Sequence, residues 1–258
     1  MNEFEKSASL ATAKILEDAD LKSEIKLVAL LGSTADGEAV PHYSDVDLLV
    51  IPNNDDNGRI NHDVIVKLKA IATHVSSVNE VKLSILTFTI DDLETFVDEE
   101  FLTHFSWRKT TYSKNDDTIQ SICNSILAKR KVTAEKMQAL VVNDLRKMRF
   151  DLIRKYISQN EFNSSGYIRA FGREFIDKLF EISDRALIFD GIWSKTKKEV
   201  MENIVSNYKD KFDTTAMQEV YAMRSGWNEA TDAELEDCFE RWISYVNSVI
   251  AHTISKVK

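Results

Sequence analysis

Two short apolar runs near the start of the chain, residues 25–31 and 45–51, constrain its fold most strongly. Gly32 closes the first run and Pro52 closes the second. Runs of this length that end in turn residues are typical of strands buried in a sheet. Residues 81–88 add an alternating, β-branched pattern that favours a third strand. The first part of the chain is therefore predicted to contain a small sheet.

Helical periodicity surrounds these strands and then takes over the rest of the chain. Residues 3–20 and 60–75 have apolar side chains at helical spacing, and Thr89 is placed to cap a short helix that ends at Val97. After residue 114 the strand patterns disappear. Only helices are predicted from there on, over residues 117–130, 133–159, 165–189, 195–211, 214–225 and 233–256.

This change of pattern predicts two domains. The expected fold is an α/β (α+β) domain with a small mixed sheet over residues 1–114, followed by an all-helical bundle domain over residues 115–258. A chain of 258 residues is long enough to build two hydrophobic cores. Its seven Gly and two Pro also suit a helix-rich structure, because both residue types interrupt helices.

Composition excludes several classes of protein. No stretch approaches the roughly 18 apolar residues that a membrane span needs, and the start of the chain does not resemble a signal peptide. Cys123 and Cys238 form no CxxC pair, so we expect two buried, reduced thiols in a cytoplasmic protein. The five His residues lack the spacing of zinc ligands.

The net charge limits the choice of partner. A formal charge of -9 disfavours a nucleic acid, because proteins that bind its backbone usually present a basic face. The acidic balance favours a small-molecule, cationic or protein partner instead.

A pair of aspartates, Asp45 and Asp47, opens the second apolar run. Side chains alternate along a strand, so both carboxylates are expected to point the same way. Two carboxylates at the start of an apolar strand are costly unless a cation lies between them, and Mg²⁺ prefers such oxygen ligands. We therefore predict that Asp45 and Asp47 hold the metal.

A Gly-Ser turn, Gly32-Ser33, ends the first apolar run. Gly32 allows the backbone to approach a phosphate closely, and the hydroxyl and amide of Ser33 can hold its oxygens. Each motif alone is common. Together, a loop that holds phosphate and a carboxylate pair that holds metal form the minimum apparatus for phosphoryl or nucleotidyl transfer.

The combined stretch, residues 30–51, reads LLGSTADGEAVPHYSDVDLLVI. It resembles the signature of the DNA polymerase beta-like nucleotidyltransferase superfamily. More narrowly, it resembles the aminoglycoside adenylyltransferases of the streptomycin/spectinomycin type, which share the Gly-Ser, the Asp-Gly, the Pro and the Ser-Asp-x-Asp-Leu-Leu-Val. The resemblance implies a nucleotidyltransferase domain followed by a helical acceptor-binding domain.

The resemblance also implies an activity. The enzyme would move AMP from ATP, its co-substrate, to a hydroxyl of a small molecule, with Mg²⁺ as cofactor. An aminoglycoside antibiotic as acceptor would make it a resistance enzyme, and an acidic cleft would attract such a polycation.

The family usually has a third carboxylate on a neighbouring strand. Glu80 matches the expected general base, which would take the proton from the acceptor hydroxyl. Alternatively, Glu80 is only a polar residue at a strand start, and Lys82 occupies the position of the third acid. Lys195 matches a lysine near the nucleotide phosphates in the family, or it is a solvated lysine at a helix start.

Two other functions stay open on this sequence. One is a degenerate nucleotidyltransferase domain that binds a nucleotide or a protein without turnover, which Lys82 at the third-acid position would favour. The other is transfer of a nucleotide to a protein or to a tRNA, and the net charge counts against the tRNA version.

Overall fold

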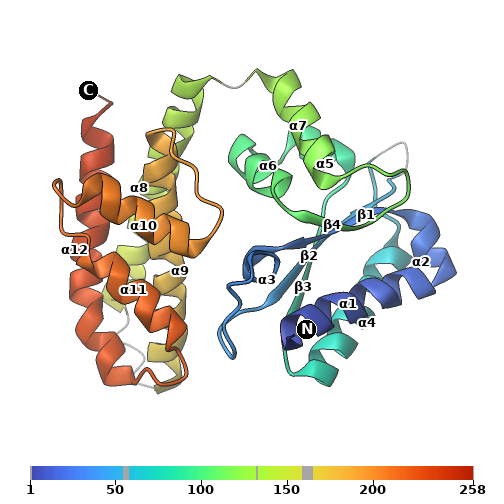
Figure 1. The fold of residues 1–258 in the computed structure, drawn as a ribbon, viewed down its shortest axis with the longest axis horizontal. Coiled ribbons are helices and arrows are strands. Elements are labelled where there is room, and N and C mark those ends of the chain that lie inside the picture. The colour runs from blue at the N-terminus through green and yellow to red at the C-terminus, as the bar shows by residue number, and fades with distance from the viewer. Residues whose placement is uncertain (1, 55–57, 132, 159–164, 258) are drawn as a thin grey trace. The chain divides into compact units, whose positions relative to one another are not determined.

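The computed structural model describes residues 2–54, 58–131, 133–158 and 165–257 (Figure 1). The chain divides into two compact units, Met1–Val132 and Thr133–Lys258. An α/β part and a helical part were predicted from the sequence, with the division at residue 114. The structure places the division later, and each unit is described by itself below.

A four-stranded mixed sheet forms the centre of the first unit. It consists of β1 (Ile25–Leu31), β2 (Val46–Pro52), β3 (Leu83–Thr87) and β4 (Lys109–Ser113), in the order β3-β2-β1-β4. Strand β1 runs antiparallel to β2 and β4, whereas β2 and β3 are parallel. The predicted small mixed sheet is confirmed, with one additional strand at its edge.

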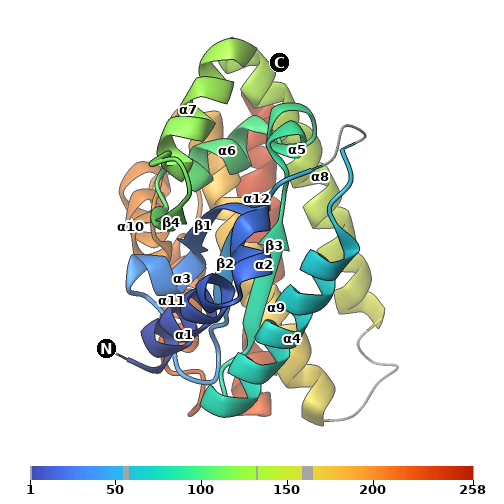
Figure 2. The same cartoon turned by 90° about the vertical axis from the view of Figure 1, so that its right-hand side faces the viewer.

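One face of the sheet packs against helices α1 (Glu3–Glu17), α2 (Ala19–Glu24) and α4 (His62–Asn79). Figure 2 shows α4 running alongside β3, which it contacts. The first predicted helix, over residues 3–20, is in fact two. Asp18 has extended backbone and accepts a hydrogen bond from the Leu21 amide, so it ends α1 and caps α2.

The opposite face packs against helices α5 (Ile90–Thr95), α6 (Glu99–Ser106) and α7 (Ile119–Arg130). Thr89 caps α5 as predicted, and its hydroxyl accepts a hydrogen bond from the Asp92 amide. The side chains of β2 alternate between the two faces, as its pleat requires. The first face buries Val46, Leu48 and Val50, and the second buries Leu49 and Ile51.

Helix α7 explains why the first unit extends beyond residue 114. It packs along α6, and its Cys123 side chain lies within the core of that face. Arg130, at the end of α7, donates hydrogen bonds to the backbone oxygens of Leu93, Glu94 and Val97. These contacts tie α7 to the sheet unit.

The second unit is a bundle of five helices within its described residues. These are α8 (Ala134–Ser158), α9 (Ser165–Phe189), α10 (Lys197–Tyr208), α11 (Thr215–Ser225) and α12 (Asp232–Ser255). Figure 1 shows α8, α9 and α12 side by side, and α9 contacts all four of the others. The predicted end of α8 at residue 159 lies outside the described residues. The all-helical bundle is otherwise confirmed.

Aromatic side chains fill the core of this bundle. Phe175, Phe239 and Trp242 are fully buried, and their rings are in mutual contact. Cys238 on α12 is buried and free, as is Cys123 in the first unit. Burial raises the pKa of both thiols, to about 12 for Cys123. Across the described helices, none has both the length and the apolar character to cross a membrane.

Candidate active site

The two predicted metal ligands lie at the start of β2, which has a paired strand on each side. Asp47 is the second residue of β2, and Asp45 directly precedes the strand. By alternation both face the same side as Leu49 and Ile51, and both are partly buried. The first unit therefore presents two carboxylates at one end of its sheet.

Gly32 lies directly beside Asp47. The pairing of Leu31 with Asp47 brings the ends of β1 and β2 together. Gly32 has a left-handed backbone, with φ of 62°. A Cβ atom at this position would lie 2.7 Å from Oδ2 of Asp47. The carboxylate therefore occupies space that only a glycine leaves open. The left-handed backbone also favours glycine at this position.

A short helix, α3 (Gly32–Asp36), follows where the sequence predicted a tight turn. The Thr34 hydroxyl donates to the backbone oxygen of Asp45 at 3.4 Å. Arg108 forms a mostly buried ion pair with Asp36. These contacts hold α3 against β2 and the start of β4. The roles of Thr34 and Arg108 were not predicted, because no sequence motif links Thr34 to Asp45 or Arg108 to Asp36.

Glu80 and Lys82 lie in different environments. Glu80 follows the end of α4 with a left-handed φ of 55°, and its side chain is exposed. No hydrogen bond or ion pair joins that side chain to another residue in the described ranges. Lys82 instead donates from its ammonium group to Oδ2 of Asp45 at 2.7 Å. The structure thus places Lys82 against the aspartate pair.

The parallel pairing of β2 and β3 explains this placement. The Val46 amide donates to the backbone oxygen of Lys82 at 2.9 Å, and Val46 pairs with Leu83. Lys82 therefore lies level with Asp45. Leu83 packs into the first core and Leu86 against the second, so alternation directs Lys82 towards the side of Asp45 and Asp47.

The remaining predicted residue, Lys195, belongs to the helical unit. It directly precedes Thr196, the cap of α10. Its side chain is exposed, and its backbone amide donates to Oε2 of Glu199 at 2.8 Å. The other predicted site residues, Gly32, Ser33, Glu80 and the two aspartates, all belong to the sheet unit.

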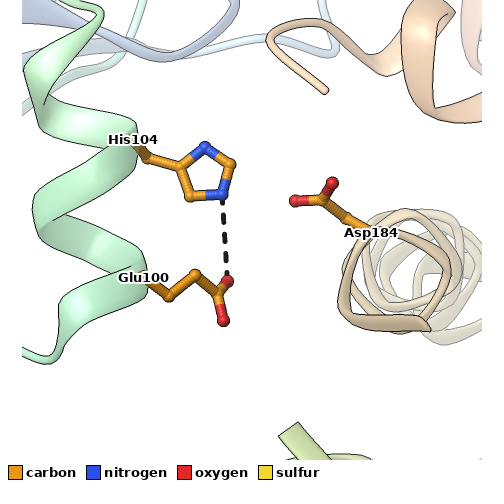
Figure 3. A group of neighbouring side chains, drawn as sticks. All are labelled: Glu100, His104 and Asp184. Atoms are coloured by element: carbon orange, nitrogen blue, oxygen red, sulfur yellow. Dashed lines mark ion pairs between the residues drawn. The ribbon is translucent and has the colours of Figure 1, made fainter. Parts of the chain in front are cut away.

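Helix α6 carries a carboxylate and an imidazole on one face (Figure 3). Oε1 of Glu100 and Nε2 of His104 are 3.9 Å apart, one helical turn from each other. Asp184, also drawn in Figure 3, belongs to α9 of the other unit. Residues four apart on a helix are neighbours on its surface, so this contact follows from the helix itself. We assign the pair no part in catalysis.

The helical unit has a small polar pocket beside α11 and α12. Its volume is about 140 Å³. Ordinary ligand pockets measure about 300–1,000 Å³. The pocket is therefore too small to hold an aminoglycoside. It is lined by Asp213, Thr215, Ala216, Glu219, Arg241, Ser244, Tyr245 and Ser248.

Comparison with known proteins adds an independent observation. The family model described as "Nucleotidyltransferase domain" matches residues 12–132 of the chain. The match covers all four strands and ends where the first compact unit ends. No curated protein matches the sequence. The matched segment contains the glycine, serine and aspartate residues of the site.

Proposed function

We propose that this chain moves AMP from ATP to a hydroxyl of a small molecule. Residues 12–132 form a nucleotidyltransferase domain of the DNA polymerase beta-like superfamily, and the chain is thus a nucleotidyltransferase. One observation carries this proposal. Asp47, the second aspartate of the pair at the start of β2, lies directly beside the Gly32 backbone at the end of β1. Carboxylates for a metal and a loop for phosphate therefore share one end of the sheet.

The groups present at the aspartate pair fit a divalent cation. Asp45 and Asp47 offer carboxylate oxygens, the ligands that Mg²⁺ prefers. Asp45 forms an ion pair with the ammonium group of Lys82, so the aspartate pair attracts positive charge. Bound there, Mg²⁺ would neutralise the triphosphate and polarise the α-phosphoryl group.

Gly32 and Ser33 would bind the triphosphate. Gly32 brings its backbone directly beside the Asp47 carboxylate, and Ser33 adds a hydroxyl and an amide as donors. Thr34 and Arg108 keep this segment in place through Asp45 and Asp36. We also propose Lys195 of the helical unit as a phosphate ligand, on the family resemblance.

Glu80 is the proposed general base. In the proposed reaction it takes the proton of the acceptor hydroxyl, whose oxygen attacks the α-phosphorus of ATP, and pyrophosphate leaves. Its exposed position leaves the carboxylate accessible to an acceptor.

Replacing the base should slow chemistry without weakening nucleotide binding. We expect Glu80→Gln to lower the single-turnover rate of pyrophosphate release by about 10²-fold or more, because the amide cannot accept the proton. Glu24→Gln is a matched control, since Glu24 also lies at a junction between a helix and a strand of the same unit. Nucleotide affinity, measured by thermal shift with Mg²⁺ and ATP, should be unchanged in both variants. A Glu80→Gln rate equal to that of the control would remove Glu80 from the mechanism.

The proposed acceptor is an aminoglycoside antibiotic, which would make the protein a resistance enzyme. The formal charge of -9 suits a polycationic acceptor. We expect pyrophosphate release from ATP and Mg²⁺ when streptomycin, spectinomycin or kanamycin is added, and none with ATP alone. A lincosamide, which also offers hydroxyls, completes the panel.

The outcome of this panel tests the proposed acceptor class. Release with streptomycin, spectinomycin or kanamycin supports the proposal and identifies the acceptor, whereas release with the lincosamide alone would contradict it. Stabilisation by nucleotide without pyrophosphate release with any of the four would contradict the proposed acceptor class.

A further inference from the structure

The positively charged side chain of Lys82 contacts Asp45, one of the two proposed metal ligands. We infer that its ammonium group takes the place of a second divalent ion, so that the site holds one divalent cation with its nucleotide. This inference rests on the proposed metal role of Asp45 and Asp47, and it is independent of the acceptor.

The sheet and an ion pair both hold Lys82 at the aspartate pair. The bond from Lys82 to Asp45 measures 2.7 Å, and the neighbouring backbone bond from Val46 to Lys82 fixes β3 at this level of β2. Alternation along β3 directs residue 82 to the side of the aspartates. The lysine is thus held at the site by the sheet as well as by its own ion pair.

The net charge of the site also favours a single divalent ion. Sites with two divalent ions place them about 3.5–4 Å apart, and shared carboxylates hold them. Three carboxylates with two divalent ions carry a net charge of one positive unit. Two carboxylates with one ammonium group and one divalent ion carry the same net charge. A second divalent ion added to the lysine would bring three cations together at two carboxylates, which Coulomb repulsion opposes.

The competing explanation is an ordinary surface ion pair. The Lys82 side chain is 71% exposed, and exposed pairs of this kind contribute little to stability. Such a lysine would turn away and leave room for two ions. The number of ions bound therefore separates the two explanations.

Equilibrium dialysis with Mn²⁺ and the non-hydrolysable α,β-methylene analogue of ATP gives that number. The measured quantity is the ratio of Mn²⁺ to analogue retained by the protein. We expect a ratio of one for the unaltered protein and two for Lys82→Asp, which adds a third carboxylate. Lys129→Asp is the matched control and should keep a ratio of one. Lys129 is 68% exposed and pairs with Glu94 at 3.0 Å in the same unit.

A second measurement tests the charge itself. Lys82→Met should weaken binding of the Mn²⁺–analogue complex by about 10-fold, because a hydrogen-bonded charge is lost next to the triphosphate. Lys129→Met should leave that affinity unchanged.

Three results would overturn the inference. They are a ratio of two in the unaltered protein, a ratio unchanged by a folded Lys82→Asp, and an affinity unchanged by Lys82→Met. If Asp45→Asn also leaves Mn²⁺ retention unchanged, the proposed metal role itself is wrong. The failure of the inference alone is thus distinguishable from the failure of the proposed function.

Discussion

Asp47→Asn should lower the rate of pyrophosphate release by about 10³-fold or more. The cation that would neutralise the phosphoryl charge then loses one charged oxygen ligand. Asparagine has nearly the same shape as aspartate but one acceptor oxygen and no charge. Asp47 is partly exposed at the end of the sheet, so the fold should tolerate the change. The measurement is the single-turnover rate with ATP, Mg²⁺ and an acceptor that supports release.

Asp91→Asn is the control for this variant. Asp91 is an exposed acid of the same unit, at the start of α5, and accepts a hydrogen bond from the Asn54 side chain at 2.9 Å. Its rate should match that of the unaltered protein. An Asp47→Asn enzyme that keeps a tenth of its rate would show that Asp47 is no metal ligand.

Gly32→Ala should also lose most of its activity. Its methyl group would lie 2.7 Å from Oδ2 of Asp47, which is too close for a real contact. The carboxylate or the loop must therefore shift. A misplacement of about 1 Å at a reacting centre costs about 10²-fold in rate, and we expect a loss of that size. The measurement is again pyrophosphate release under single-turnover conditions.

Gly37→Ala separates this contact from backbone strain. Gly37 also has a left-handed backbone, with φ of 74°, but a Cβ atom there would meet nothing within 4 Å. Both variants should lose about 1–2 kcal/mol of stability from the left-handed conformation, as measured by urea unfolding. Only Gly32→Ala should lose most of its activity. Equal activities in the two variants would rule out the contact with Asp47 as the cause.

Much of the fold follows from local patterns. Strands β1, β2 and β3 are apolar or alternating, and α9 covers the same residues as its predicted helix. Strand β4 was not predicted, because its sequence, KTTYS, is polar and it pairs only with β1 at the edge of the sheet. Helix α6 was also missed. The boundary at 114 followed the loss of strand patterns, whereas the structure keeps α7 with the sheet.

The site was predictable only where its parts are close in sequence. The Gly-Ser turn and the aspartate pair join two adjacent strands, so their proximity follows from the pairing of β1 with β2. Whether Glu80 or Lys82 faces Asp45 depends on where α4 ends and on the register of β2 with β3. A change of one or two residues in either would alter which side chain faces Asp45, and sequence patterns do not fix helix ends or strand register that closely. The lysine contact therefore needed the structure.

The buried thiols have a practical consequence for studying the two units. Cys123 lies in the sheet unit and Cys238 in the bundle, and both are inaccessible and weakly acidic. A thiol reagent reacts with the thiolate and needs access to it, so each cysteine can be labelled only when its own helix opens. Mass spectrometry of the two labelled peptides would follow the local opening of each unit separately, in the unaltered chain and without an attached probe.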